Sequence, residues 1–320
     1  MNSPPRISVI LPNYNHASFL PQRINSILNQ TWQDFELIIL DDCSTDSSRD
    51  VISQYADKHK NTRVEFNQEN SGSPFKQWQK GVSLARGEFV WVAESDDVAD
   101  PQFLEQLYPI ISQDDSIALI YAQSYDIDEH GNRLANRIYW TNDFSPNVWK
   151  HNFTLDGNEV IEKYFLHKNV IPNASAVLFR KNVFQERYDA SASRMKMAGD
   201  WLLWISMLID YKMAFVATPL NHFRMHEHTT RIHNTPQKKL RRMIEEAKVI
   251  HKIHLIRGVD QQAVRIQERI LLHHWFRFFP WPQMIFQAEF YQVCGPIHLS
   301  PVLLLLKATV FKIRNKLSKP

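Results

Sequence analysis

The sequence predicts an α/β protein with a doubly wound, mostly parallel sheet, followed by a C-terminal helical extension. Over roughly the first 126 of 320 residues, short apolar runs alternate with segments of helical periodicity, as in βαβ units. From Pro236 onward, apolar residues recur at helical spacing. With 44% hydrophobic and 22% charged residues, the chain is globular rather than disordered or fibrous.

Five short apolar runs in the first part predict strands, at residues 6–11, 35–40, 63–66, 88–93 and 117–122. The segments between them have helical spacing, at residues 20–29, 47–58, 74–85 and 101–111. Since parallel strands need crossover connections, and helices usually supply them, we expect these strands to share one sheet. Such sheets bind ligands at the carboxyl ends of their strands, where the strand order reverses.

After about residue 126 the alternation weakens. Residues 133–154 are polar, rich in aromatic residues and irregular, and we expect them to form a lobe beside the sheet. Residues 175–179 predict one more strand, and residues 200–209 a strongly apolar helix. We place the first domain at residues 1–235, with halves of about 1–126 and 127–235, and the extension at 236–320.

The charge distribution separates the two parts. The segment from Gln237 to Pro320 holds fifteen Lys or Arg and five Asp or Glu, a net of +10, which leaves −7 for the rest of a chain whose total is +3. An acidic body offers no cationic surface for phosphates, which argues against a nucleic-acid partner. The tail interleaves its cations with aromatic residues such as Trp275 and Trp281. This pattern is typical of association with a membrane surface, but packing on the first domain or a homodimer would fit it equally.

The sequence gives no indication of a membrane-spanning helix. The longest uncharged stretch, residues 290–306, contains Pro296 and Pro301, which interrupt the ~20 apolar residues that a span requires. The start lacks the features of a signal peptide, and two cysteines cannot form a disulfide framework. We therefore expect a cytoplasmic protein, peripheral on the cytoplasmic face of the membrane if the tail binds lipid.

Two clusters of acidic residues follow predicted strands. Asp41 and Asp42 end the second strand, and Glu94, Asp96 and Asp97 follow the fourth. Carboxylates at neighbouring strand ends repel each other unless a cation lies between them, and a divalent cation that bridges phosphate oxygens would supply that charge. The alternative is a set of solvated loop acids and helix caps, which three acids in four residues after a buried strand make less favourable.

The order of these segments resembles glycosyltransferase family 2, the inverting enzymes of GT-A fold. The matching pieces lie within residues 6–230 and are ISVILPNYNHASFLPQRINSILNQTWQDFELIILDDCSTDSS, NSGSPFKQWQKGVSLARGEFVWVAESDD, AGDWLLW and FRMHEHTT. The first two are highly specific in combination. The resemblance implies transfer of a sugar from a nucleoside-diphosphate sugar, most simply a UDP-sugar, with inversion. It further implies Mg²⁺ or Mn²⁺ as cofactor, and as acceptor a hydroxyl of a cell-surface glycan, a lipopolysaccharide or a lipid-linked oligosaccharide. The lobe would then face the acceptor.

The resemblance also implies roles for individual residues. The donor would be bound by three groups: Pro12, Asn13 and Tyr14 at the base, Asp41 and Asp42 at the uracil or ribose, and Glu94 and Asp96 at the diphosphate. The metal would be held by Asp96, Asp97 and His226.

Asp200, in AGDWLLW, matches the position of the family's catalytic base. An inverting transfer needs one base to take the proton of the acceptor hydroxyl as its oxygen attacks the anomeric carbon. Because Asp200 opens a predicted helix, it could instead be the N-cap of that helix.

The sequence departs from the family pattern at three places. Glu94 stands where the common form has Asp, and Gly199 where it has Glu. Residues 77–79 are Gln-Trp-Gln where many members have Ala-Arg-Asn, so that Lys76 is a candidate for the lost cation.

Two other classes of protein are alternatives to a glycosyltransferase. A nucleotidyltransferase of related fold would need a basic glycine-rich loop after the first strand, which PNYNHASF does not provide. A non-catalytic sugar-nucleotide-binding protein would not require Asp200. Neither G-x-G-x-x-G nor G-x-x-x-x-G-K-[ST] occurs, which argues against dehydrogenases and P-loop enzymes.

Overall fold

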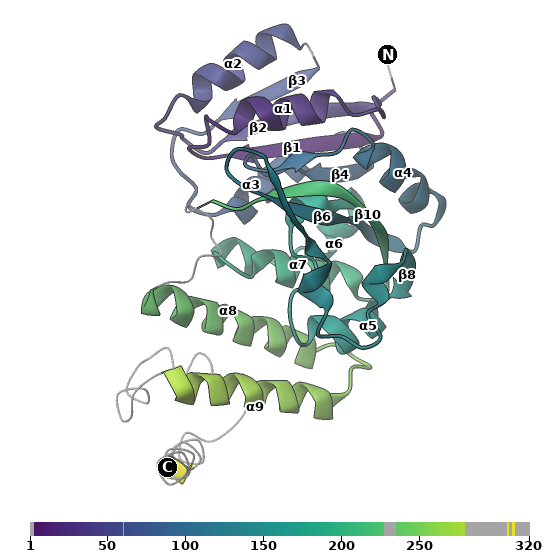
Figure 1. Ribbon diagram of the computed structural model, residues 1–320, viewed down its shortest axis with the longest axis vertical. Coiled ribbons are helices and arrows are strands. Elements are labelled where there is room, and N and C mark those ends of the chain that lie inside the picture. Colours follow the sequence, from purple (N-terminus) through teal and green to yellow (C-terminus); the bar gives the residue numbers. More distant parts are fainter. Residues whose placement is uncertain (1–2, 60, 227–234, 279–305, 307–308, 311–320) are drawn as a thin grey trace.

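The computed structural model describes residues 3–59, 61–226, 235–278, 306 and 309–310. Its centre is one mixed sheet with the strand order β3-β2-β1-β4-β9-β6-β10-β5, to which β7 adds beside β6 and β8 beside β10. Helices cover both faces of the sheet, and two further helices lie along one end of the body (Figure 1). The predicted α/β class is confirmed.

The first part of the sheet is parallel, as predicted. It contains β1 (Ile7–Asn13), β2 (Phe35–Asp41), β3 (Thr62–Phe66) and β4 (Phe89–Val92). The helices between and after these strands are α1 (Leu20–Leu28), α2 (Ser48–Lys58), α3 (Pro74–Leu84) and α4 (Phe103–Gln113). β1 pairs with β2 on one side and β4 on the other, so the strand order reverses at β1. The carboxyl ends of β1, β2 and β4 therefore meet at one edge.

The second part of the sheet is mixed. It contains β5 (Val98–Ala99), β6 (Ile117–Ile127), β7 (Arg133–Asn136), β8 (Phe153–Asp156), β9 (Val177–Arg180) and β10 (Lys212–Arg224). β9 runs antiparallel to both β4 and β6 and so joins the two parts. The helices here are α5 (Gly157–Val160), α6 (Lys181–Arg187) and α7 (Gly199–Leu208). Between β7 and β8, the lobe predicted at residues 133–154 is irregular as expected, with 3-10 turns at Arg137–Thr141 and Val148–Lys150.

The long strand β10 was not predicted from the sequence. Its apolar run from Met213 to Ala217 is followed by Thr218 and by Pro219, which removes one backbone donor. The register with β6 shifts on either side of Pro219, so irregular pairing takes up the interruption and the strand continues to Arg224. Periodicity alone does not reveal a strand of this kind.

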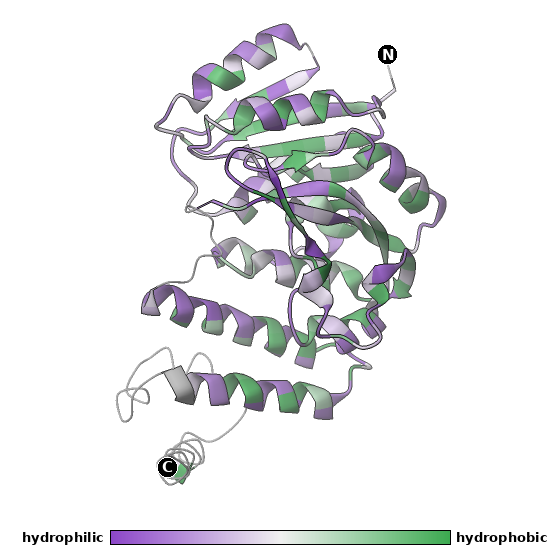
Figure 2. Cartoon of the chain, in the orientation of Figure 1, coloured by the Kyte–Doolittle hydropathy of each residue, from purple (hydrophilic) through white to green (hydrophobic). Residues whose placement is uncertain are grey.

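The C-terminal helices pack on the body. In α8 (Pro236–His254), Met243, Ala247 and Ile250 are buried in the same hydrophobic cluster as Trp204 of α7. Helix α9 (Gln261–Phe278) lies along α8 and adds Trp275 to that cluster. Both helices carry hydrophilic and hydrophobic stripes (Figure 2). Helix α8 thus packs on the first domain and α9 packs along α8, whereas most tail residues beyond Phe278, including Trp281, lie outside the described part. The boundary at residue 235 stays a prediction.

Among the described residues, no helix is both long enough and apolar enough to cross a bilayer.

Candidate active site

A cavity of about 800 Å³ opens at the carboxyl edge of β1, β2 and β4 and extends to the start of α7. Most of the site residues predicted from the sequence line this cavity: Pro12, Asn13, Tyr14, Asp42, Glu94, Asp96, Asp97 and Asp200. Three nominated residues, Asp41, Lys76 and His226, are outside this lining. Acids from distant segments thus converge on one cavity, as expected for the ends of parallel strands.

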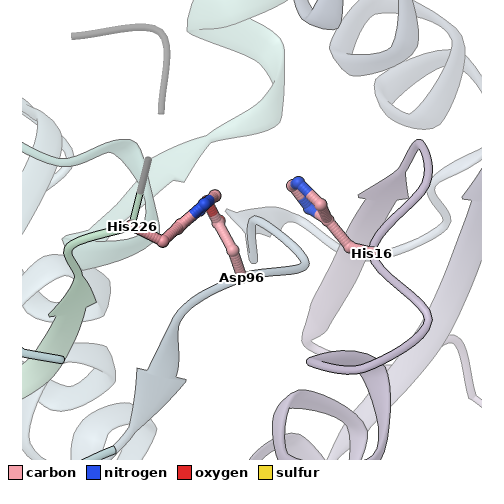
Figure 3. Close-up of side chains that lie close together, drawn as sticks. All are labelled: His16, Asp96 and His226. Carbon is pink, nitrogen blue, oxygen red and sulfur yellow. The ribbon is translucent and has the colours of Figure 1, made fainter. Parts of the chain in front are cut away.

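Asp96 and His226 come together, and His16 joins them (Figure 3). Nε2 of His226 lies 3.0 Å from Oδ2 of Asp96. One ligand atom on each of the three side chains lies within 4.8 Å of those on the other two, which is close enough for one metal ion. Nδ1 of His16 contacts the Ser95 hydroxyl at 2.7 Å, a bond that orients the ring. One carboxylate and two imidazoles form a donor set that fits a divalent transition ion.

Asp97 is adjacent but faces other partners. Its Oδ1 accepts the backbone N–H of Arg224 at 3.0 Å, and its Oδ2 accepts the Asn173 amide at 2.9 Å. The Arg224 guanidinium donates to the carbonyl of Asp96 at 2.7 Å, so the same residue clamps the acidic loop against β10. Of the three residues nominated for a metal, the structure brings Asp96 and His226 into one cluster and gives Asp97 a separate bonding site.

Burial and mutual repulsion shift the ionisation of these acids. Burial, with repulsion from Asp96, raises the pKa of Glu94 to about 8, and the same two causes raise the pKa of Asp97 to about 6. Burial also opposes ionisation of Asp96, but the hydrogen bond from His226 and the nearby His16 hold its pKa below the usual value. Asp96 is therefore the acid of the cluster most disposed to carry a negative charge.

Arg23 supplies a buried countercharge beneath the cluster. It is fully buried, with its guanidinium 5.0 Å from the centre of the Trp91 ring. Desolvation lowers the pKa of Arg23 to about 10, against the attraction of Asp97, Asp96 and Glu94. Arg23 thus remains a cation at neutral pH and offsets part of the negative charge.

The acidic pair after β2 is largely engaged in shaping its own loops. The fully buried Asp41 accepts bonds from the Asn13 amide at 2.9 Å and from Arg49 at 3.1 Å. Asp42 accepts from Ser71 N–H at 2.8 Å and from the Gln77 amide at 2.8 Å. Asp41 therefore holds Asn13 in the wall, and Asp42 joins the strand end to the loop before α3.

Asp200 is the second residue of α7 rather than its N-cap. The capping position is Ala198, whose side chain makes no capping hydrogen bond, so the alternative that Asp200 is the N-cap is wrong. Oδ2 of Asp200 accepts the Asn169 amide at 2.9 Å. Oδ1 of Asn169 in turn accepts the Ile171 N–H at 3.1 Å, which fixes which side of the amide faces Asp200.

Comparisons with known proteins identify the family of this chain. The family pattern described as glycosyl transferase family 2 matches residues 8–187, more than half of the chain. The chain belongs to glycosyltransferase family 2. An uncharacterized glycosyltransferase of Methanocaldococcus jannaschii is 28% identical over 239 residues, which cover 74% of this chain and 76% of that protein.

Two solved glycosyltransferases share the fold of this enzyme. Residues 1–349 of TarS from S. aureus, in complex with UDP-GlcNAc, superpose with a TM-score of 0.65 at 18% identity, covering 91% of this chain and 80% of that one. The mannosyltransferase PcManGT from Pyrobaculum calidifontis, in complex with GDP-Man and Mn²⁺, has a TM-score of 0.59 at 13% identity, with 97% and 81% covered.

Two of the three departures of this glycosyltransferase from its family pattern are in direct contact, and the third, Gly199, faces Phe75 on the same helix as Trp78. Trp78 and Glu94 are joined by a 2.8 Å hydrogen bond from the indole N–H to Oε1. At the third departure, a Cβ built on Gly199 would lie 2.4 Å from the Phe75 ring, so no side chain fits there beside Phe75. Phe75 and Trp78 share one face of α3, and their rings are 5.2 Å apart. Lys76 donates to the Ser71 carbonyl at 3.0 Å.

Sequence reasoning missed His16 and Asn169 at this glycosyltransferase site. His16 lies two residues after the predicted donor residues Pro12, Asn13 and Tyr14, so its position after β1 was the one available signal. Asn169 lies in an irregular segment without a motif, and its role depends on a contact with Asp200 across 31 residues.

Proposed function

We propose that this glycosyltransferase is metal-dependent and transfers a sugar with inversion from a UDP-sugar to a hydroxyl group of a cell-surface glycan or lipid-linked oligosaccharide. The observation that carries the proposal is the shared cavity: Asp200 lines the same 800 Å³ space as His16 and Asp96. That volume lies in the upper part of the usual range for ligand pockets, which suits a donor together with the attacking end of an acceptor.

In this proposal Asp200 takes the proton of the acceptor hydroxyl. The Asn169 amide, bonded to Oδ2 at 2.9 Å, holds the carboxylate in a fixed orientation. A positioned base of this kind contributes about 10²–10⁴-fold to a transfer. The aromatic and apolar side chains of Trp140, Phe223 and Met225, which line the cavity, offer a surface for the acceptor sugar.

The donor would lie along the ends of β1, β2 and β4. Pro12 and Tyr14 would contact the base, while Asn13, held by Asp41, and Asp42 would orient the nucleoside. The complex of TarS with UDP-GlcNAc, a protein of the same fold, supports UDP as the nucleotide.

His16, Asp96 and His226 would hold the divalent ion, whose charge stabilises the departing diphosphate. Imidazole ligands suit Mn²⁺ better than Mg²⁺, which prefers oxygen ligands and keeps several waters. The complex of PcManGT with Mn²⁺ supports the same choice. Glu94 and Asp97 border this cluster and are bonded to Trp78 and Asn173.

The test is donor hydrolysis in the absence of acceptor. Purified protein is incubated with Mn²⁺, Mg²⁺ or EDTA and a panel of UDP-sugars, and the released nucleotide and sugar are identified. We expect slow release of UDP that EDTA abolishes, with the sugar first appearing as the inverted anomer in the NMR spectrum. Release of pyrophosphate would indicate a nucleotidyltransferase instead. Absence of any nucleotide release would contradict a transferase that uses UDP-sugars.

A further inference from the structure

Glu245, in α8, reaches the wall of the cavity from outside the region that the family pattern covers. Its Oε1 accepts a hydrogen bond from the backbone N–H of Lys196 at 2.9 Å. Its Oε2 accepts from Met197 at 2.8 Å and from Ala198 at 2.9 Å. The residue is only 4% exposed. Since an unpaired buried carboxylate is costly, the three bonds make this a defined structural contact.

The three N–H groups belong to the strip of chain that enters α7. Ala198 is the N-cap of α7, and its methyl side chain makes no capping hydrogen bond. The carboxylate of Glu245 lies at this N-terminus, where the helix dipole favours a negative charge. A side chain 47 residues farther along the chain thus takes the place of a local cap.

The same strip forms part of the cavity wall. Lys196, Met197, Ala198 and Asp200 all line the cavity, so a shift of the backbone at Glu245 moves the wall and the carboxylate together. Arg242, one turn earlier on α8, also lines the cavity. The helix itself is fixed, because Met243 and Ala247 on either side of Glu245 are buried in the hydrophobic cluster.

We propose that Glu245 is a positioning residue for sugar transfer: by holding residues 196–198 it sets the place of Asp200 against the acceptor oxygen. The inference rests on the proposed role of Asp200 as base. Glu245 does not itself touch the reacting atoms. A misplacement of about 1 Å at a reacting group can cost about 10²-fold in rate, so a rigid backing behind Asp200 matters for turnover.

The test compares Glu245→Gln with Lys248→Gln, a variant at an exposed position of the same helix. Glutamine preserves the shape but replaces one acceptor oxygen by an amide donor that faces backbone N–H groups. We expect kcat for hydrolysis of the UDP-sugar that the wild type uses to fall about 10-fold or more. This is smaller than the loss of about 10²-fold that a full 1 Å misplacement of a reacting group can cause. The Kd for UDP with Mn²⁺ should stay within about twofold, because its proposed binding residues come from β1, β2 and β4. Lys248→Gln should match the wild type.

Hydrogen exchange gives a readout that does not depend on turnover. The amides of residues 196–198 should exchange faster in Glu245→Gln, while those of β1 stay protected. If Glu245→Gln does not fold, Glu245→Asp retains the carboxylate on a shorter stem, and it should show the same faster exchange and a smaller loss of kcat.

Two results overturn the inference. One is an active wild type with an equally active Glu245 variant. The other is a parallel loss of kcat, UDP binding and thermal stability, which indicates a general structural role. A wild type that releases UDP from no donor contradicts the proposed function instead, so the two failures are distinct.

Discussion

The two halves of the cavity are held in place by different kinds of contact. In the first half, Asn13 ends β1, Asp42 directly follows β2 and Asp96 lies in the loop after β4, so the sheet itself brings them together. In the second half, Asp200 stands on a helix whose start is held by Glu245 of α8, and Asn169 fixes its carboxylate. Strand ends converge by topology, whereas this wall depends on individual side-chain contacts across long stretches of chain. Donor binding should therefore tolerate substitutions in the second half of the cavity, whereas the rate of transfer should not.

The largest effect is expected at Asp200, where a substitution should impair transfer but leave donor binding unchanged. Asp200→Asn keeps the size of the side chain but removes the proposed base, so kcat should fall by about 10²-fold or more. Titration calorimetry with UDP and Mn²⁺ should give an unchanged Kd. Asp210→Asn, just beyond the other end of α7 and exposed, serves as the control. Full activity of Asp200→Asn would remove this residue from the mechanism.

A second experiment divides the acids of the donor half. Asp96→Asn removes the only carboxylate of the cluster of His16, Asp96 and His226, so Mn²⁺ should bind more weakly. Loss of a residue that merely supports a metal ligand lowers metal affinity about 10–100-fold, and we expect at least that loss here. Asp97→Asn places an amide donor against the Asn173 amide and should chiefly lower the melting temperature. Mn²⁺ affinity is measured by electron paramagnetic resonance, and stability by thermal unfolding. A larger loss of affinity in Asp97→Asn would exchange the roles of the two acids.

The same difference explains how far the sequence predicts the molecule. Most strands and helices of the first part are confirmed within about two residues, because each is a continuous apolar or periodic segment. The strand predicted at residues 117–122 instead continues to Ile127, and the two-residue β5 was not predicted. The acids at their ends could be nominated because parallel topology places them together. Asn169 and Glu245 could not be, since their roles follow from contacts with residues 31 and 47 positions away, and for His16 the only signal was its position after β1. Strand β10 was missed because Pro219 interrupts its pattern.

The third prediction concerns the place where the halves meet, Phe75 of α3 against Gly199 of α7. Gly199→Ala puts a methyl group 2.4 Å from the Phe75 ring, so we expect a loss of about 1–3 kcal/mol in unfolding free energy from overpacking. Phe75→Leu should reduce this loss in the double variant. Urea unfolding of the four proteins in this double-mutant cycle measures the coupling. Additive losses would mean that α3 and α7 do not constrain each other here.

The smallest effect is expected at Asp189, which joins the second half to α8 through Lys252 at 3.2 Å. Burial opposes ionisation of Asp189, but hydrogen bonds from Ser191 and the Lys252 ammonium outweigh it, and its pKa lies below the ordinary value. Because the pKa is lower in the folded state than in the unfolded state, this contribution is present at neutral pH. It is lost as the pH falls from the unfolded-state value, roughly 4, through the folded-state value.

Asp189→Asn should therefore lose less stability than the wild type between pH 7 and pH 3, as measured by urea unfolding at both values. Both side chains are partly exposed, so solvent screening limits the difference to about 1 kcal/mol or less. Lys252→Gln removes the same ion pair from the other side and should reduce the pH dependence in the same direction. If both variants follow the wild-type curve, the ion pair does not stabilise the attachment of α8, and the buried contacts of Met243, Ala247 and Ile250 must hold the helix that presents Glu245.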